Sequence, residues 1–125
     1  PGAWSTLRDD APRAERLRAA GLRIAVGTDA NPGTSPALDL GLMAALAVRD
    51  AGLTAEEAIL GITSHAAAAL GRTDVGRIAT GCHGDLVVHA NRDPRTLAYA
   101  LGSVRPRHVL LGGQRVAGED GPSPW

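Results

Sequence analysis

Apolar residues recur at every third or fourth position over much of the chain, and this spacing predicts amphipathic helices. The predicted helices cover residues 12–20, 37–51, 55–62, 66–70 and 94–101. Gly21, Gly52 and Gly71 follow the first, second and fourth of these stretches, and glycine commonly ends a helix at such a position. Thr54 and Glu57 have the T-x-x-E spacing of a capping box, which predicts where the third helix begins.

The starts of the last two helices also carry capping residues. Thr63 or Ser64 is expected to cap the helix over 66–70. Asp93 is expected to cap the last helix, with Pro94 at its first position, where a missing N–H does no harm. Residues 1–11 are polar and are followed by Pro12, so we expect a loop there.

Short apolar runs between the helices predict strands. Ile24, Ala25 and Val26 are consecutive apolar residues, which is typical of a parallel strand buried on both faces, and we expect this strand over 22–28. Further strands are predicted over 85–89, 109–111 and 114–116, the last two joined by a Gly-Gly hairpin turn.

These strands do not complete a sheet. A strand buried on both faces needs a neighbour on each side, and the sequence before residue 84 offers only one such strand. The chain also begins with Pro1 rather than Met. We therefore expect an incomplete α/β fold whose missing strands lie in sequence upstream of Pro1.

Composition excludes several classes of protein. Lys and Arg total 13 and Asp and Glu total 13, so the formal net charge is zero and no field favours nucleic acid or an anionic membrane. The run 42–48 is the longest apolar stretch, far short of the roughly 20 residues of a membrane helix. Cys82, the one cysteine, cannot form an internal disulfide, and no secretion signal is visible, so we expect a cytoplasmic location.

The segment 27–36, Gly-Thr-Asp-Ala-Asn-Pro-Gly-Thr-Ser-Pro, is the best candidate for chemistry. It follows the carboxyl end of the predicted buried strand, where α/β barrels carry their catalytic groups. Asp29 could bind a divalent metal there and accept a proton from water. Asn31, Gly33 and Thr34 could hold a small ligand in the turn. The alternative is an ordinary Asx turn, because a lone Asp does not make a metal site.

The other reactive residue types show no catalytic spacing. His65, His83, His89 and His108 form neither H-x-H nor H-x-x-x-H, and we expect them to have structural roles. Cys82 has no base next to it in the sequence and is not expected to be a nucleophile. The arginines at 49, 72 and 77 are expected to be surface charges.

The stretch Gly76-Arg-Ile-Ala-Thr-Gly-Cys-His-Gly-Asp-Leu-Val-Val88 resembles the C-terminal signature of the amidohydrolase superfamily, with Gly84 at a position that is usually Ala. The helical segment 54–70 is also similar to that superfamily. The resemblance implies the C-terminal end of a metal-dependent, TIM-like (β/α)8 barrel over 1–75. Residues 76–125 would then supply the C-terminal strands of a small composite β-sandwich.

The loop Thr28-Asp-Ala-Asn-Pro-Gly-Thr-Ser-Pro36 further resembles the last-strand loop of the imidazolonepropionases. This resemblance implies that Asp29 is both a ligand of one divalent ion, zinc or iron, and a catalytic residue. It implies that Asn31, Gly33 and Thr34 contact a small-molecule substrate. The implied reaction is hydrolysis of the ring amide of 4-imidazolone-5-propanoate to N-formimidoyl-L-glutamate, by a complete enzyme that could be a homodimer.

Two alternatives remain open at this point. The chain could be a fragment of another amidohydrolase, such as a cytosine or guanine deaminase or a cyclic-amide hydrolase; the Asn-Pro-Gly-Thr string after Asp29 favours imidazolonepropionase. It could instead be a stand-alone interaction or structural domain whose loop is a simple turn. The H-x-H pair of the superfamily is absent, so this chain alone is not expected to be active.

Overall fold

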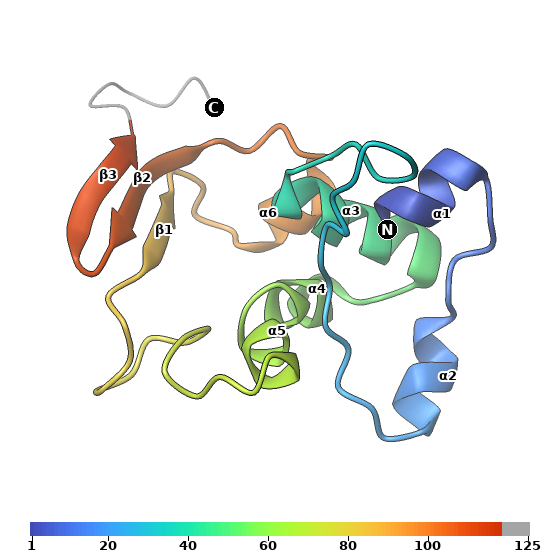
Figure 1. Ribbon diagram of the computed structural model, residues 1–125, viewed down its shortest axis with the longest axis horizontal. Coiled ribbons are helices and arrows are strands. Elements are labelled where there is room, and N and C mark those ends of the chain that lie inside the picture. Colours follow the sequence, from blue (N-terminus) through green and yellow to red (C-terminus); the bar gives the residue numbers. More distant parts are fainter. Residues whose placement is uncertain (119–125) are drawn as a thin grey trace.

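The computed structural model describes residues 1–118 and consists of six helices and a three-stranded sheet at opposite sides of the molecule (Figure 1). The helices are α1 (Gly2–Leu7), α2 (Ala14–Ala19), α3 (Leu40–Ala51), α4 (Ala55–Gly61), α5 (Ser64–Ala69) and α6 (Arg95–Tyr99). The strands are β1 (Leu86–His89), β2 (Pro106–Leu111) and β3 (Gln114–Gly118). The end of the predicted sandwich range 76–125 lies outside the described residues.

Local capping explains the best-defined helix boundaries. Thr54 and Glu57 form the predicted capping box, in which the Glu57 N–H donates to Thr54 Oγ1 and the Thr54 N–H donates to the Glu57 carboxylate. Gly52 ends α3 in the left-handed conformation with φ of 76°, as predicted. The predicted start of α3 at residue 37 is wrong, because Asp39 is extended and its carboxylate caps the helix by accepting from the Leu42 N–H.

Two other predicted starts differ in their details. Thr63 precedes α5, but its hydroxyl donates to the Ile59 carbonyl at 2.7 Å instead of capping the helix. Asp93 accepts a hydrogen bond from the Arg95 N–H, as an Asx cap would, while Pro94 lies at the N-cap position and not within α6. The predicted extension of this helix to residue 101 is wrong, since Leu101 has a φ of 45°.

The loop predicted over residues 1–11 is also wrong in part, because α1 occupies Gly2–Leu7. Short helices of this kind owe more to tertiary packing than to intrinsic propensity. Gly2 is buried, and the half-buried Trp4 packs against the core cluster. These contacts stabilise a helix that the polar local sequence does not indicate.

The strand predicted over 22–28 is absent: within residues 1–118 this segment is neither helix nor strand. It lies instead against the end of α4, where the Val26 N–H donates to the Gly61 carbonyl at 2.9 Å. A Cβ on Gly61 would come within 2.9 Å of Val26 Cγ2, so glycine permits this close approach. A strand requires a hydrogen-bonded neighbour, and the described residues place none beside this segment.

The sheet is antiparallel in the order β1-β2-β3, with Val87 opposite Val109 and Val109 opposite Ala117. The predicted hairpin is confirmed, since Gly112 and Gly113 connect β2 to β3 with φ of 57° and 80°, the signs that a type I′ turn requires. The strands predicted over 85–89, 109–111 and 114–116 are therefore present, and β2 begins three residues earlier than expected.

The core lies among the helices. Met43, Ala44 and Ala47 of α3 are almost completely buried, together with Ala58 of α4 and Ala98 of α6. Small alanine side chains let these helices approach closely, which suits a chain with no Phe. Helix α6 belongs to the range 76–125 but packs on α3 and α4. The packed helices, called the helical layer below, therefore extend across the domain boundary predicted at residue 75.

Candidate functional site

The predicted site segment folds as a closed loop organised by the side chain of Asn31. Its Oδ1 accepts hydrogen bonds from the Gly33 N–H at 3.0 Å, the Thr34 N–H at 2.8 Å and the Thr34 hydroxyl at 3.3 Å. Its Nδ2 donates to the Asp29 carbonyl at 2.7 Å. Asparagine is suited to this role because its amide is both donor and acceptor. The structure thus brings all four predicted site residues together.

Ser35 closes the loop from the other side. The Asn31 N–H donates to the Ser35 carbonyl at 3.0 Å, which joins the two ends of the turn. The Ser35 hydroxyl donates to the Thr28 carbonyl at 2.6 Å, and Ser35 is 0% exposed. A Cβ on Gly2 would overlap this hydroxyl, so the first residue of α1 lies directly against Ser35.

Asp29 is exposed and has a left-handed backbone with φ of 47°. Asp and Asn reach this region more readily than other residues with a side chain, although it is still less favoured than the ordinary regions. The Asp29 carboxylate therefore belongs to an accessible residue on a loop held by hydrogen bonds.

The described residues can supply one ligand of a metal centre, but they cannot form a complete centre. A carboxylate oxygen is a suitable ligand for zinc or iron, and Asp29 offers one. Zinc sites use three or four protein ligands, but residues 1–118 contain no group of three His, Cys, Asp or Glu side chains that could hold an ion. Any metal at Asp29 would need ligands from elsewhere.

The histidines make contacts with residues other than Asp29. His65 of α5 places Nδ1 at 3.2 Å from the Ile24 carbonyl, so it attaches α5 to the chain that leads into the loop. His83 pairs with Asp74 at 3.1 Å, and His89 and His108 belong to β1 and β2.

Asp74 is the centre of a second polar cluster, in a turn that precedes the sheet. Arg72 makes two hydrogen bonds of 2.8 Å to its carboxylate and holds the pKa of Asp74 well below its usual range. The His83 N–H donates to the Asp74 carbonyl, and Cys82 Sγ lies 3.9 Å from the Thr73 carbonyl. Every side-chain contact in this cluster is exposed, and together they close the turn without forming a catalytic arrangement.

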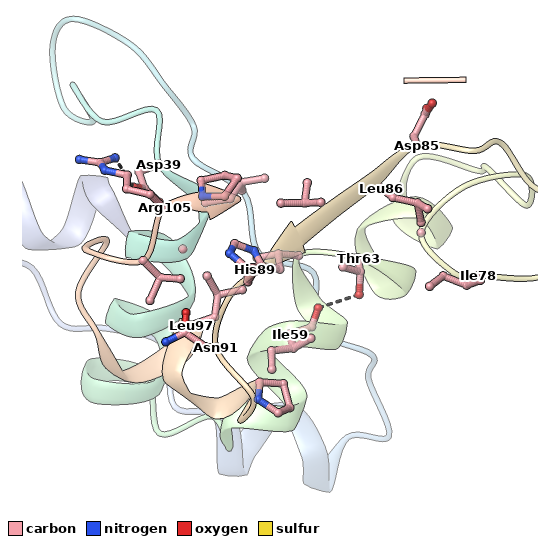
Figure 2. Close-up of a pocket in the computed structure, with 18 of the residues that line it drawn as sticks. Asp39, Ile59, Thr63, Ile78, Asp85, Leu86, His89, Asn91, Leu97 and Arg105 are labelled. Carbon is pink, nitrogen blue, oxygen red and sulfur yellow. Dashed lines mark hydrogen bonds and ion pairs between the residues drawn. The ribbon is translucent and has the colours of Figure 1, made fainter. Parts of the chain in front are cut away.

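A cavity of about 580 Å³ lies between the helices and the sheet, and its lining does not include the Asp29 loop. Figure 2 shows its lining, with Ile59, Leu97 and Ile78 along the apolar walls and Arg105 beside Asp39 at one rim. Arg105 and Asp39 are 3.8 Å apart. His89 also faces this cavity, and its Nδ1 is buried with no hydrogen-bond partner among the described residues.

The sequence prediction missed Ser35 and Gly2. Ser35 stands beside Pro36 in a stretch rich in turn residues, and Gly2 lies in a stretch expected to be a loop. Neither residue has a local pattern that indicates a contact between them. Only the burial of Ser35 and the position of α1 identify this pair.

Among the described residues, no helix is both long and apolar enough to cross a membrane.

Comparison with known proteins places this chain in a family. The profile of the Amidohydrolase family matches residues 2–116. The imidazolonepropionase of Cereibacter sphaeroides (strain KD131) is 48% identical over 112 residues, which cover 89% of this chain and 28% of that protein. The imidazolonepropionase of Paracidovorax citrulli is 48% identical over 118 residues (93% of this chain, 28% of that protein). That of Streptomyces griseus is 45% identical over 116 residues (93% and 30%).

The chain therefore spans less than a third of the length of these relatives. The profile match, by contrast, extends over the helices, the Asp29 loop and most of the sheet. From this match, the chain belongs to the amidohydrolase family.

Proposed function

We propose that this chain is the C-terminal part of an imidazolonepropionase, which hydrolyses the cyclic amide of 4-imidazolone-5-propanoate to N-formimidoyl-L-glutamate. The observation that carries the proposal is the identity of 45–49% to proteins of that name, which extends over most of the chain. The closed Asp29 loop supports it, because the proposed metal-dependent hydrolysis would use an accessible carboxylate held in a defined position.

Asp29 is the residue of this chain that would act in the chemistry. Its carboxylate would be one ligand of a single divalent ion, zinc or iron, and would accept the proton of the water that attacks the ring carbonyl. The ion, when bound, would lower the pKa of that water and polarise the carbonyl. The remaining ligands are assigned to the part of the complete enzyme that this chain does not contain.

Asn31, Gly33 and Thr34 would contact the substrate at the turn. Asn31 Oδ1 is already occupied by three hydrogen bonds, so its contribution would come from the second N–H of Nδ2. The Thr34 hydroxyl makes only a long bond of 3.3 Å and can still accept a hydrogen bond. Gly33 lacks a side chain, and its N–H already donates to Asn31 Oδ1, so it would offer the substrate only its backbone carbonyl and Cα surface.

The same proposal implies the domain structure of the complete enzyme. Residues 1–75 would complete a TIM-like metal-dependent barrel, and residues 76–125 would supply strands to a small β-sandwich. The complete enzyme would be cytoplasmic, would act on a small molecule rather than on nucleic acid or at a membrane, and could be a homodimer.

A chimeric enzyme tests the proposal. This chain replaces the matched segment of the C. sphaeroides imidazolonepropionase, and the purified chimera is assayed for loss of 4-imidazolone-5-propanoate and formation of N-formimidoyl-L-glutamate. We expect a kcat/KM within about tenfold of the unaltered relative, or roughly 1.4 kcal/mol of activation free energy. A chelator should abolish turnover, and zinc or iron should restore it.

The controls distinguish the proposed activity from that of another amidohydrolase. The unaltered relative, purified in the same way, gives the reference rate. A folded, metal-loaded chimera with no turnover of this substrate would overturn the proposal, and turnover of cytosine or guanine in its place would indicate another amidohydrolase.

A further inference from the structure

Ser35 is the one polar residue among the completely buried side chains of the described chain. Burying a hydroxyl is unfavourable unless it is hydrogen-bonded, so the hydrogen-bond partner of a buried serine is important for the structure. The Ser35 hydroxyl donates to the Thr28 carbonyl at 2.6 Å. That carbonyl belongs to the peptide group that joins Thr28 to Asp29.

Both peptide groups next to the Asp29 Cα are therefore held by side chains of the loop. Ser35 holds the preceding one through the Thr28 carbonyl, and Asn31 holds the following one through the Asp29 carbonyl at 2.7 Å. Because the orientation of these two peptide planes sets φ and ψ, the two bonds together fix the backbone of Asp29. They hold it at a φ of 47°, which a residue with a side chain does not favour by itself.

We propose that Ser35 is a positioning residue that aims the Asp29 carboxylate, with α1 sealing it from water. The sealing contact is Gly2, which is buried and leaves no room for a Cβ beside the Ser35 hydroxyl. Water that reached this hydroxyl would compete for its bond to Thr28. The inference rests on the proposed function, because it is for that reaction that the direction of Asp29 matters.

The proposal predicts that loss of the Ser35 hydroxyl affects kcat more than KM. Ser35 is completely buried and so would not touch the substrate, and its loss should misdirect Asp29 without removing a substrate contact. A misplacement of about 1 Å at a reacting group can cost on the order of a hundredfold in rate. The effect should therefore fall on kcat and leave KM nearly unchanged.

The test compares Ser35→Ala with Ser103→Ala in the chimera described above. Ser103 is exposed, and its hydroxyl donates to the Ala100 carbonyl at 2.7 Å, so this control removes a bond of the same kind outside the loop. We expect Ser35→Ala to lower kcat about ten- to hundredfold with KM within about threefold. Amide hydrogen exchange of residues 29–34 should become faster in Ser35→Ala, and Ser103→Ala should change neither readout.

Ser35→Cys is the second variant, for use if Ser35→Ala does not fold. Cysteine is close to serine in size but is a weak donor, so we expect a kcat between those of the chimera and Ser35→Ala, with loop exchange raised. The inference is overturned if the folded variant keeps kcat within about twofold or leaves loop exchange unchanged, or if neither variant folds, which would make Ser35 a folding residue only. An inactive chimera before any substitution would instead refute the proposed function, and this inference with it.

Discussion

The helical layer and the sheet of this chain are stabilised in different ways. Helices α2, α3, α4 and α6 share a continuous core in which Met43 and Ala44 are 0% exposed. Within residues 1–118, no apolar side chain of the sheet is fully buried, and β3 is exposed along its whole length. The sheet is held by backbone hydrogen bonds and cross-strand pairs, while the helices are held by burial.

This difference explains where a precise site can be built. The Asp29 loop lies against α1 and is joined to the helical layer through Val26 and Ser35, so it is supported by packed structure. The sheet, in contrast, leaves Val87, Leu111 and Val116 more than half exposed. A small sheet with uncovered apolar side chains needs a second layer for independent stability. This supports the proposal that the strands belong to a larger β-sandwich.

The largest expected effect is on kcat, and it should distinguish the carboxylate of the loop from a carboxylate beside the sheet. In the chimera, Asp29→Asn keeps the shape but removes a negative ligand and proton acceptor, and we expect kcat to fall about a thousandfold, or roughly 4 kcal/mol. Asp85→Asn is the matched control, since Asp85 Oδ1 only accepts from the Gly112 N–H at 2.7 Å and an amide oxygen can do the same.

Steady-state kinetics with metal analysis measures both variants. Asp85→Asn should stay within about threefold of the chimera, a difference below 1 kcal/mol. A near-normal kcat in Asp29→Asn would remove Asp29 from the mechanism.

The second prediction compares the two kinds of stabilisation directly. Met43→Ala empties part of the helical core and should lower the free energy of unfolding by about 2–5 kcal/mol. Val116→Ala, at a side chain that is 56% exposed in β3, should change it by less than about 0.5 kcal/mol. Urea unfolding of the chain followed by circular dichroism measures both, and similar losses for the two would show that the sheet is also stabilised by burial.

A smaller effect is expected from the Thr34 hydroxyl. Thr34→Val removes one group that would contact the substrate, and we expect a loss of about 1–2 kcal/mol that appears mainly as a higher KM. Thr80→Val, at an exposed turn residue outside the helical layer, is the matched control and should leave kcat and KM unchanged. If Thr34→Val lowers kcat and spares KM, Thr34 acts in positioning and not in binding.

The smallest effect concerns pH and the ion pair that joins α2 to α4. Arg18 donates to the Glu57 carboxylate at 2.6 Å and lowers the pKa of Glu57, and the Thr54 N–H adds to this shift. Because the folded-state pKa is the lower one, ionised Glu57 stabilises the fold above the usual glutamate pKa. This stabilisation is lost as the pH falls through the folded-state value.

Thermal unfolding of the chain between pH 7 and pH 3 tests this. Glu57→Gln should show a shallower loss of stability on acidification, and Glu56→Gln, at the exposed neighbouring residue of α4, should follow the original profile. The sheet bonds between backbone groups do not titrate, so they should not contribute. Identical profiles for the chain and Glu57→Gln would show that exposure cancels the ion pair.

Features that depend on a few neighbouring residues were predictable. The Thr54–Glu57 box, the stop at Gly52 and the Gly112-Gly113 hairpin each follow from side-chain or backbone chemistry within about one turn. The candidate loop was also identified from its residue types, and the structure places Asp29, Asn31, Gly33 and Thr34 in one turn. Their roles in binding and catalysis stay predictions that the chimera tests.

Features that depend on distant partners were not predictable. The segment 22–28 has the composition of a buried strand, yet a strand forms only beside another strand, and here the segment contacts Gly61 and His65 instead. Helix α1 was missed for a similar reason, because its polar local sequence is outweighed by the contacts of Gly2 and Trp4.

The sequence by itself determined the local elements of this protein and the chemical groups of its loop, because caps, turns and residue types act over short distances. Only the tertiary structure decided that Ser35 is buried beneath α1 and that both peptide groups of Asp29 are held by hydrogen bonds. The burial of Ser35 arises from its contact with Gly2, which lies far from it along the chain. The hydrogen bond from Ser35 to Thr28 is local, and it gains its structural weight only once this packing has excluded water from it.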